Sequence, residues 1–448
     1  MEAHETAHWF DPLFTTSGMR RIFSDAGRLT AILDFEAALA RSQARVGVIP
    51  GSVVRAIEAN CRAERFDIGA LSRASALAGN SAIPIVNTLE ALVAKTDADA
   101  AQYVHWGATS QDAMDTGLVL QLRAALDLME SDLASLSVPL AELARAHKAT
   151  LIVGRTWLQH ASPTTFGLKT AGWLSAINRS LERIRAMRPR VLALQFGGST
   201  GTLSALGEHG LRVAAALADD LRLALPDLPW HTHRDRAVEV ATTLGLMVGT
   251  LGKFARDISL MAQSEVGELA EPHETGRGES SSMPHKSNPV GCAVVLAAAV
   301  RVPALVSVML SGMVQEHERG LGGWHAEWET LPEICTLAAG ALAQIHHIVK
   351  GLRIDTDRMA ANLEAARGLV QAEAVTMSLA RSLGRSKAHE PVQRACRLAI
   401  EQGCHLREAL AADPQILERL SAADLNGLFD LEHEIRYAAS LVERVLKE

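Results

Sequence analysis

The 448-residue sequence is poor in aromatic residues and cysteines, and each shortage excludes a class of protein. Aromatic residues make up only 4% of the chain, whereas alanine and leucine are abundant, which favours tightly packed helices over sheets. The five cysteines are scattered, and no C-x-x-C pair occurs. We therefore expect neither a disulfide framework nor a zinc site, and we expect reduced thiols.

Membrane and nucleic-acid partners are also disfavoured. The first residues, Met1 to Glu5, are charged and polar and lack the apolar core of a signal peptide. The longest apolar run, Val290 to Val300, stops at Arg301 and Pro303 and is too short to cross a bilayer. The formal net charge of −7 argues against nucleic-acid binding. We expect a cytoplasmic protein in which an anionic substrate needs a locally basic pocket.

Helical periodicity dominates the sequence. Two segments repeat apolar residues at alternating steps of three and four, which keeps one stripe on one helix face. The first stripe is Leu118, Leu122, Leu126, Met129, Leu133, Leu136 and Leu140, and the second is Leu244, Met247, Leu251, Phe254, Ile258 and Met261. Such long stripes suit a near-parallel helical bundle. Because no comparable period-two alternation occurs, we predict an all-α fold with little or no sheet.

The most informative stretch is the Gly- and Ser-rich segment from Gly278 to Pro289, just before the apolar run. It gathers three hydroxyls, Lys286 and Asn288 around a Met-Pro step. Backbone amides and hydroxyls of such a loop bind anions, and a following helix adds the positive end of its dipole. We expect the loop to hold carboxylate oxygens and to close over them.

This loop resembles the signature of the fumarase/aspartase superfamily, G-S-S-x-M-P-x-K-x-N. The matching residues are Ser280, Ser281, Met283, Pro284, Lys286 and Asn288. Glu279 stands where the pattern has glycine, and because Glu reaches positive φ less readily, we expect a stiffer hinge. The resemblance implies three helical domains, residues 1–112, 113–352 and 353–448, the middle one a long helical bundle. It also implies a homotetramer with those bundles at its core and with active sites shared between subunits.

The segment from Val104 to Asp112 also fits the superfamily. Thr109 and Ser110 are suited to cap a helix that begins near Asp112, and a capped N-terminus is itself an anion site. By resemblance, this loop binds a substrate carboxylate, and His105 matches a histidine that contacts substrate in adenylosuccinate lyases. Arg319, in a later matching segment, is a further expected carboxylate ligand.

A third matching segment, from Gly154 to Pro163, contains the most discriminating departure. Superfamily lyases usually carry Thr-His where this chain has Thr156-Trp157, and that histidine is taken to protonate a departing amine. A carboxylate leaving group, with a pKa of roughly 4, needs no such proton. Trp157 therefore indicates a carbon bond to a carboxylate oxygen, as in a lactone. By resemblance, Arg155 and Gln159 bind substrate. His160 is either an acid or a histidine bonded to backbone at a helix interface.

The segment from Trp324 to Trp328 separates the chain from the adenylosuccinate lyases, which carry Ser-Ser and Arg there. Because phosphate binding favours arginine and hydroxyls, the two indoles argue against a nucleotide substrate, although both are also suited to pack inside the bundle. Arg234 fits the superfamily as well, either as a structural ion pair or as a substrate contact. His231 and His233 lack carboxylates or thiols at ligand spacing, so no metal site is expected.

Together, the segments from Gly154 to His160 and from Trp324 to Glu329 resemble the bacterial 3-carboxy-cis,cis-muconate cycloisomerases. That family needs no cofactor and closes an acyclic tricarboxylate to carboxymuconolactone in the protocatechuate branch of aromatic degradation. The expected substrate ligands are Thr109, Ser110, Arg155, Gln159, Ser281, Asn288 and Arg319. Ser280 matches the catalytic base of related lyases and here supplies the proton, with Lys286 as its stabilising partner. His160 and His105 are the alternative proton donors.

Two other interpretations stay open. The first is another superfamily lyase, such as an argininosuccinate or adenylosuccinate lyase, against which Trp157 counts. The second is a non-catalytic structural oligomer like the lens crystallins of this superfamily, against which the complete signature loop counts.

Overall fold

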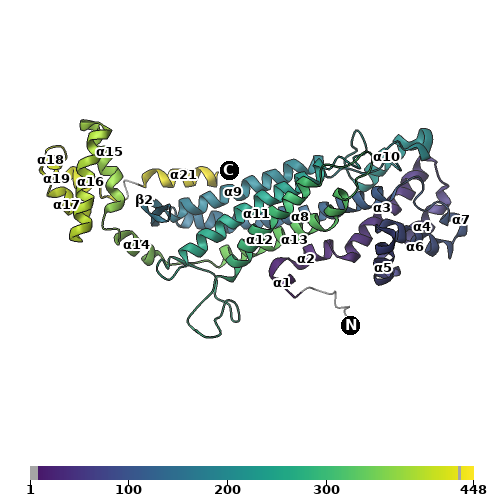
Figure 1. Cartoon of the computed structure of the whole chain (residues 1–448), viewed down its shortest axis with the longest axis horizontal. Coiled ribbons are helices and arrows are strands. Elements are labelled where there is room, and N and C mark those ends of the chain that lie inside the picture. Colours follow the sequence, from purple (N-terminus) through teal and green to yellow (C-terminus); the bar gives the residue numbers. More distant parts are fainter. Residues whose placement is uncertain (1–8, 432–434, 448) are drawn as a thin grey trace. The chain divides into compact units, whose positions relative to one another are not determined.

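Helices account for most of the structure, a computed structural model that describes residues 9–431 and 435–447 (Figure 1). The α-helices are α1 (Asp11–Phe14), α2 (Ser17–Ile22), α3 (Asp25–Val46), α4 (Val54–Asn60), α5 (Ile68–Ala78), α6 (Ala82–Ala94), α7 (Ala98–Ala101), α8 (Ser110–Ala146), α9 (Phe166–Val191), α10 (Gly210–Leu221), α11 (Asp235–Met261), α12 (Val290–Ser311), α13 (Gly323–Lys350), α14 (Thr356–Glu364), α15 (Ala372–Leu383), α16 (Arg385–Gln402), α17 (Leu406–Ala411), α18 (Pro414–Leu417), α19 (Ala422–Gly427) and α21 (Arg436–Leu446). Short 3-10 helices are η1 (Gly51–Val53), η2 (Ala63–Arg65), η3 (Ser204–His209) and η4 (Leu369–Gln371). The strands are β1 (Leu151–Thr156), β2 (Gln159–Thr165), β3 (Leu269–Ala270) and β4 (Arg353–Ile354). The predicted all-α class with little sheet is confirmed.

Strands occur only as two antiparallel pairs in the described part of the chain. β1 and β2 form a hairpin in which Arg155 lies opposite His160 and Thr156 opposite Gln159. β3 pairs with β4 over two residues of each strand. The hairpin matters for function because it carries three of the predicted site residues.

The chain divides into two compact units, each assembled from segments that are separate in the sequence. The first unit comprises Met1–Leu133, Arg179–Gly252 and Ala293–Ile345, and the second comprises Ala134–Asn178, Lys253–Cys292 and His346–Glu448. The long helices α8, α9, α11, α12 and α13 each contribute residues to both units. The division into three domains, 1–112, 113–352 and 353–448, stays a prediction.

Both apolar stripes expected from the sequence face the core. On α8, the members from Leu122 to Leu140 are at most 3% exposed, and Leu118 is half-buried. On α11, the members from Leu244 to Met261 are at most 4% exposed. The three-and-four spacing therefore identified the buried face of each helix correctly.

In the first unit, α3 packs against α4 and α10. Its start is fixed by Ser24, whose hydroxyl accepts a hydrogen bond from the N–H of Gly27 at 3.0 Å. It ends at Gly47, where φ is 87° and a side chain would be strained. Between these caps, the helix buries Phe35 together with the neighbouring carboxylate of Glu36. α3 thus carries a charged group into the interior of the first unit.

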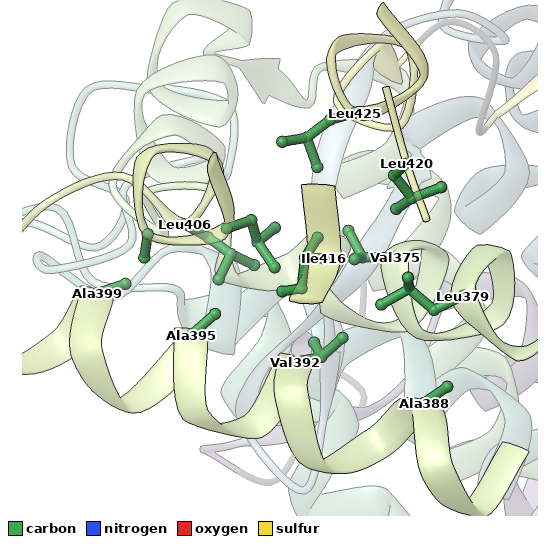
Figure 2. Packing of buried hydrophobic residues seen from close by; sticks show 12 residues of the cluster. Val375, Leu379, Ala388, Val392, Ala395, Ala399, Leu406, Ile416, Leu420 and Leu425 are labelled. Atoms are coloured by element: carbon green, nitrogen blue, oxygen red, sulfur yellow. The ribbon is translucent and has the colours of Figure 1, made fainter. Parts of the chain in front are cut away.

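The second unit contains a separate apolar core between α15, α16, α17, α18 and α19 (Figure 2). Its buried members are Val375, Leu379, Ala388, Val392, Ala395, Ala399, Leu406, Ala409, Leu410, Ile416, Leu420 and Leu425. Ala388, Ala395 and Ala399 of α16 recur at helical spacing on the face turned toward these larger residues. Their small side chains let the shorter helices approach α16 closely.

Two described helices, α11 and α12, are long and apolar enough to cross a membrane by length and composition alone. The apolar window of α11 is 56% buried within the chain, whereas that of α12, with a mean hydropathy of 2.3, is only 28% buried. The apolar run itself ends at Arg301 and Pro303, but the helix that contains it is longer, because α12 continues through both residues to Ser311. Arg301 lies on the exposed side of α12 and forms an ion pair with Glu333 on α13. Core helices of soluble proteins meet the same length criterion, so it does not place either helix in a membrane.

Gly340 on α13 allows a close approach of the chain at α1, which gives a test of the packing. A Cβ at Gly340 would lie 2.1 Å from the carbonyl oxygen of Phe14, a backbone atom that cannot swing aside. We predict that Gly340→Ala lowers the free energy of unfolding by about 1–3 kcal/mol, as overpacking does. Gly249→Ala on α11, where nothing lies within 4 Å, is the control and should be neutral or stabilising by up to about 1 kcal/mol. Denaturant unfolding that gives the same change for both variants would contradict this packing.

Candidate active site

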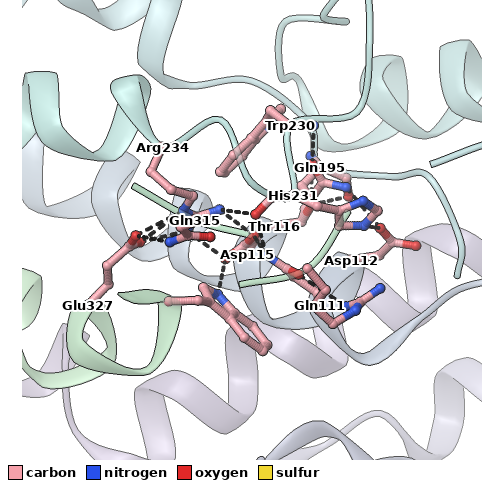
Figure 3. Close-up of polar contacts among 12 residues, drawn as sticks. Gln111, Asp112, Asp115, Thr116, Gln195, Trp230, His231, Arg234, Gln315 and Glu327 are labelled. Atoms are coloured by element: carbon pink, nitrogen blue, oxygen red, sulfur yellow. Dashed lines mark hydrogen bonds and ion pairs between the residues drawn. The ribbon is translucent and has the colours of Figure 1, made fainter. Parts of the chain in front are cut away.

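Asp112, in the first turn of α8, is fully buried and organises the site in the first unit (Figure 3). Its carboxylate accepts hydrogen bonds from the N–H groups of Thr109, Gly197 and Gly198 and lies against Nε2 of Gln195 and of His231, all at 2.9–3.0 Å. The helix start is therefore capped by Asp112, which bonds the Thr109 amide, and not by the expected hydroxyls. The same carboxylate fastens the glycine-rich loop at residues 197–201 to the N-terminus of α8.

Arg319 is positioned on this frame. Its Nη1 donates to Oε1 of Gln111 at 3.0 Å, and its Nη2 donates to the carbonyl oxygen of Ser199 at 2.8 Å. Both acceptors are neutral, and no carboxylate among the described residues forms an ion pair with Arg319, so its positive charge is available to an anion. Thr109 and Ser110, beside Gln111, are half-buried, and their hydroxyls bond to no other residue that the structure describes. These three predicted ligands therefore lie together, and their contact with substrate stays a prediction.

His105 lies just before this helix start and is held by a buried carboxylate. Its Nδ1 is 2.6 Å from Oε1 of Glu36 on α3. Burial disfavours the charged ring, but the negative charge and hydrogen bond of Glu36, with a contribution from Asp112, outweigh it and raise the pKa of His105 above its ordinary value. The imidazole is thus suited to carry a positive charge in the site.

Arg234 is a buried structural residue. It is 1% exposed, and its guanidinium bonds both Asp115 and Glu327, with a closest distance of 2.7 Å to each (Figure 3). Trp324 is 5% exposed and donates from Nε1 to Asp115 at 3.0 Å, while its ring packs edge-on against Trp328 at 5.0 Å between centroids. The structural-ion-pair interpretation of Arg234 and the packing interpretation of Trp324 are therefore confirmed, whereas Trp328 is only half-buried and its packing interpretation stays a prediction.

The hairpin in the second unit presents an apolar tip. Trp157 and Leu158 connect β1 to β2 with φ angles of 52° and 63° and are 98% and 73% exposed. Tight hairpin turns with positive φ normally carry Gly, Asn or Asp, so two large residues here are unusual. Gln159 and His160 follow on β2, where both are exposed, and their side chains make no hydrogen bond to another described residue. The interpretation of His160 as a backbone-bonded histidine at a helix interface is therefore wrong.

Arg155 on β1 has an internal partner that the sequence did not reveal. Its guanidinium forms two hydrogen bonds, of 2.9 and 2.6 Å, with the fully buried carboxylate of Glu268. Asn362 donates to the same carboxylate at 2.8 Å. Arg155 and His160 line a cavity of about 350 Å³ together with Arg358 and Asn362. Because Glu268 already neutralises Arg155, the predicted substrate role of this arginine would have to come from its shape and hydrogen bonds rather than its charge.

The signature segment forms a long loop between β3 and α12 (Figure 1). Asn288 closes its neck, because its backbone N–H and its Nδ2 donate to the carbonyl oxygen of Gly278 at 2.9 and 3.1 Å. Glu279 and Ser287 pair as an isolated bridge beside it. Gly278 has a φ of 69°, and a Cβ there would lie 2.5 Å from the carbonyl oxygen of Asn288. Asn288 thus has a structural role in addition to its predicted substrate role.

Beyond the neck, the predicted catalytic residues are accessible. The hydroxyl oxygen of Ser280 accepts from the N–H of Met283 at 3.1 Å, and the N–H of Lys286 donates to the carbonyl oxygen of Met283 at 3.0 Å. Ser281 and Lys286 are exposed. Within the described residues, no hydrogen bond joins this loop to the hairpin, so Ser280 and His160 are not hydrogen-bonded to each other.

Two of the free backbone N–H groups at the N-terminus of α12 are already bonded to a carboxylate of this chain. The carboxylate of Glu271 accepts from the N–H groups of Gly291 and Cys292 at 3.0 and 2.7 Å. The expectation that the helix after the loop offers its N-terminal amides to substrate is therefore wrong for these two groups. The anion-binding groups left in the loop are its own amides, its hydroxyls and Lys286.

Sequence reasoning missed four buried carboxylates that position these groups, namely Glu36, Asp112, Glu268 and Glu271. A signal for Glu36 was present, because it is an acidic residue between apolar residues on the buried face of α3. The residues described by the structure contain no group of three or more His, Cys, Asp or Glu side chains that could hold a metal. His231, considered earlier as a ligand, is used by Asp112 instead.

Comparison with known proteins agrees with the fold and the motifs. A family profile described as lyase matches residues 14–304, and one described as adenylosuccinate lyase C-terminus matches residues 368–445. A 3-carboxy-cis,cis-muconate cycloisomerase of Pseudomonas aeruginosa is 56% identical over 98% of this chain and 96% of its own length. A protein of the same name from Bradyrhizobium diazoefficiens is 48% identical over 97% of this chain and 96% of its own. The crystal structure of 3-carboxy-cis,cis-muconate lactonizing enzyme from Pseudomonas putida has a TM-score of 0.92 and 53% identity, with 98% of each chain covered.

The assignment of Arg234 to the interior predicts a stability defect. Arg234→Met leaves Asp115 and Glu327 buried without a cation, which typically costs about 3–5 kcal/mol of unfolding free energy. Burial raises the pKa of Glu327 although Arg234 opposes it, so loss of Arg234 raises this pKa further. The defect should therefore shrink from about pH 8 to about pH 5, as the carboxyl group binds a proton in the folded state.

The matched control is Arg45→Met, since Arg45 forms an exposed ion pair with Asp219 in the same unit and should change stability by less than about 1 kcal/mol. Urea unfolding at several pH values measures both. If Arg234→Met kept normal stability but bound substrate weakly, Arg234 would be a substrate ligand.

Proposed function

The chain belongs to the lyase family of the fumarase/aspartase superfamily, and from this premise we propose that it is a cofactor-independent cycloisomerase of 3-carboxy-cis,cis-muconate. One carboxylate of the substrate adds to an alkene carbon of the same molecule, and a proton joins the adjacent carbon to give carboxymuconolactone. Relatives of 48–56% identity carry the name of this activity. The observation that carries the proposal is Trp157, fully exposed at the hairpin tip where superfamily lyases usually carry a proton-donating histidine.

The nature of the bond explains why a tryptophan suffices there. In the delactonising direction, the group that leaves carbon is a carboxylate with a pKa of roughly 4, which is stable without a proton. An amine that leaves as an anion is far too basic, so an amine-eliminating lyase needs an acid at this place. The indole N–H of Trp157 is far too weak an acid to serve as a general acid near neutral pH. The argininosuccinate and adenylosuccinate lyase alternatives are therefore disfavoured.

The anionic substrate and intermediate need fixed positive groups, because the chain as a whole has a net charge of −7. Arg319, with neutral acceptors only, and the hydroxyls of Thr109 and Ser110 are suited to one substrate carboxylate. Lys286 and the signature-loop amides are suited to the extra charge that develops on the carboxylate next to the carbanion. Holding the diene folded brings nucleophile and target together, and such proximity lowers barriers by roughly 7–11 kcal/mol.

The proton that completes the lactone comes from Ser280 in this proposal. A serine hydroxyl is a very weak acid and exchanges protons poorly by itself, so Lys286 and the loop amides must stabilise its alkoxide. His160 and His105 are the alternative donors. His160 is exposed beside the hairpin tip, whereas the Nδ1 of His105 is committed to Glu36.

A homotetramer, with active sites shared between subunits, is part of the proposal. Support comes from α12, whose apolar window is only 28% buried within the chain. Val300, Val308 and Leu310 on this helix are 77%, 40% and 50% exposed, which leaves an apolar face for other copies of the chain. We place the enzyme in the cytoplasm and in the protocatechuate branch of aromatic degradation.

The direct test is turnover of candidate substrates by the purified protein. With 3-carboxy-cis,cis-muconate, we predict loss of ultraviolet absorbance as ring closure removes the conjugated diene, and a lactone product in the NMR spectrum. Argininosuccinate and adenylosuccinate should stay intact. Release of fumarate from either, with carboxymuconate unchanged, would replace this proposal by an amine-eliminating lyase. Inactivity toward all three would favour a structural oligomer.

The role of Ser280 gives a second prediction. Ser280→Ala should reduce turnover at least about a hundredfold, in line with the contribution of general acid–base catalysis, with little change in stability. Ser282→Ala is the control, because Ser282 is exposed in the same loop at a position that the superfamily signature leaves free. Near-normal turnover by Ser280→Ala would remove this serine from the mechanism and favour a histidine donor.

A further inference from the structure

Glu36 differs from the other buried carboxylates in having a single partner. Its Oε1 lies 2.6 Å from Nδ1 of His105, and its Oε2 is buried without a hydrogen bond to any described residue. Among the described residues, the other buried carboxylates bond to an arginine or to two or more N–H groups, namely Asp112, Asp115, Glu268, Glu271 and Glu327. Because a buried carboxylate is costly unless compensated, the position of His105 and the charge of Glu36 depend on each other.

The backbone around His105 also fixes the ring in one place. His105 has a φ of 56°, a conformation that few residues with side chains adopt. The next residue, Trp106, is tethered to α3 because its carbonyl oxygen accepts from Nε2 of Gln43 at 2.6 Å. Gly107 follows with a φ of 70°, and a Cβ there would lie 2.6 Å from the side chain of Leu206. The strained turn is held from both sides, which is typical of functional positions.

We propose that Glu36 is a positioning residue that holds His105 through Nδ1, so that Nε2 is presented as an N–H donor to a carboxylate of the substrate. Nε2 makes no hydrogen bond to another described residue, and the side chain of His105 is 16% exposed. A carboxylate on one ring nitrogen fixes which nitrogen faces the ligand. The inference rests on the proposed function, to which it adds a residue that acts through His105 rather than on the substrate.

The charges around the ring agree with this assignment. The groups that act on His105 are Glu36 on α3 and Asp112 on α8, both negative and both opposed to its burial. The nearby Cys61 stays a neutral thiol, because burial and then Glu36, Glu58 and Asp34 raise its pKa. His105 therefore keeps its proton to a higher pH than a free histidine, whose pKa is about 6.5, and loses it as pH rises through the elevated value.

The test compares Glu36→Gln with the wild-type protein by two measurements. The first is the pH titration of the ring Cε1–H NMR signals of the 17 histidines, with His105 assigned by the signal lost in His105→Asn. Glu36→Gln keeps the size and hydrogen-bonding capacity of the side chain and removes its charge. We expect the midpoint for His105 to fall by about one pH unit or more.

The second measurement is the pH profile of kcat/KM for carboxymuconate. The alkaline limb should move to lower pH in Glu36→Gln by the same amount as the ring titration, with activity recovered at low pH and partly restored in Glu36→Asp. Glu58→Gln, which removes a similar charge from the same unit, is the control and should leave both the His105 titration and the profile unchanged. An unchanged His105 midpoint in Glu36→Gln, or an equal loss of activity at every pH, would overturn the inference.

The experiments distinguish an error in the proposed function from an error in the role of Glu36. If the wild-type protein does not lactonise carboxymuconate, the proposed function falls. Calorimetric binding of propane-1,2,3-tricarboxylate then replaces kinetics, and the inference predicts about tenfold weaker binding to Glu36→Gln than to wild type at a pH between the two His105 titration midpoints, but equal binding at a pH below both midpoints. Equal binding at both pH values would overturn the role of Glu36 by itself.

Discussion

The candidate site depends on one buried carboxylate. The Asp112 carboxylate accepts hydrogen bonds from two backbone N–H groups of the glycine-rich loop and from the N–H group at the start of α8. It also contacts Nε2 of Gln195 and of His231, and no arginine or lysine among the described residues pairs with it. Hydrogen bonds to a charged group contribute about 1.5–3 kcal/mol each, so this arrangement compensates the burial of the charge and fixes two segments that lie far apart in the sequence. Arg319 is oriented by Gln111 and Ser199, which belong to those two segments. The positions of Thr109, Ser110 and Arg319 therefore follow from Asp112.

The chemistry assigned to the site needs positive charge where substrate carboxylates bind and little proton donation to a leaving group. Arg319 and Lys286 have no ion-pair partner among the described residues, so both keep their charge for a ligand. Arg155 and Arg234 are neutralised by internal carboxylates and are part of the framework. In a chain whose net charge is negative, the cationic side chains without an ion-pair partner are therefore assigned to substrate binding, and the paired ones to structural support.

The sequence predicted those features that local patterns determine. The apolar stripes of α8 and α11 were identified because helical spacing repeats within one segment, and the signature loop because its residues are contiguous. Partners distant in sequence, such as Glu268 for Arg155 and Glu36 for His105, depend on tertiary packing that no local pattern encodes. The apolar run likewise did not indicate the full length of α12, because the run ends at Val300 whereas the helix continues with Arg301 on its exposed side, paired with Glu333 of α13. Whether Trp324 packs or binds was likewise decided by Asp115, more than two hundred residues away.

The most direct test of the account is a crystal structure of the protein with a tricarboxylate bound. The account predicts one carboxylate within hydrogen-bond distance of the Arg319 guanidinium and of the Thr109 and Ser110 hydroxyls, with Asp112 still bonded to the amides of Gly197 and Gly198. A tricarboxylate bound elsewhere, with these three side chains free of it, would contradict the account.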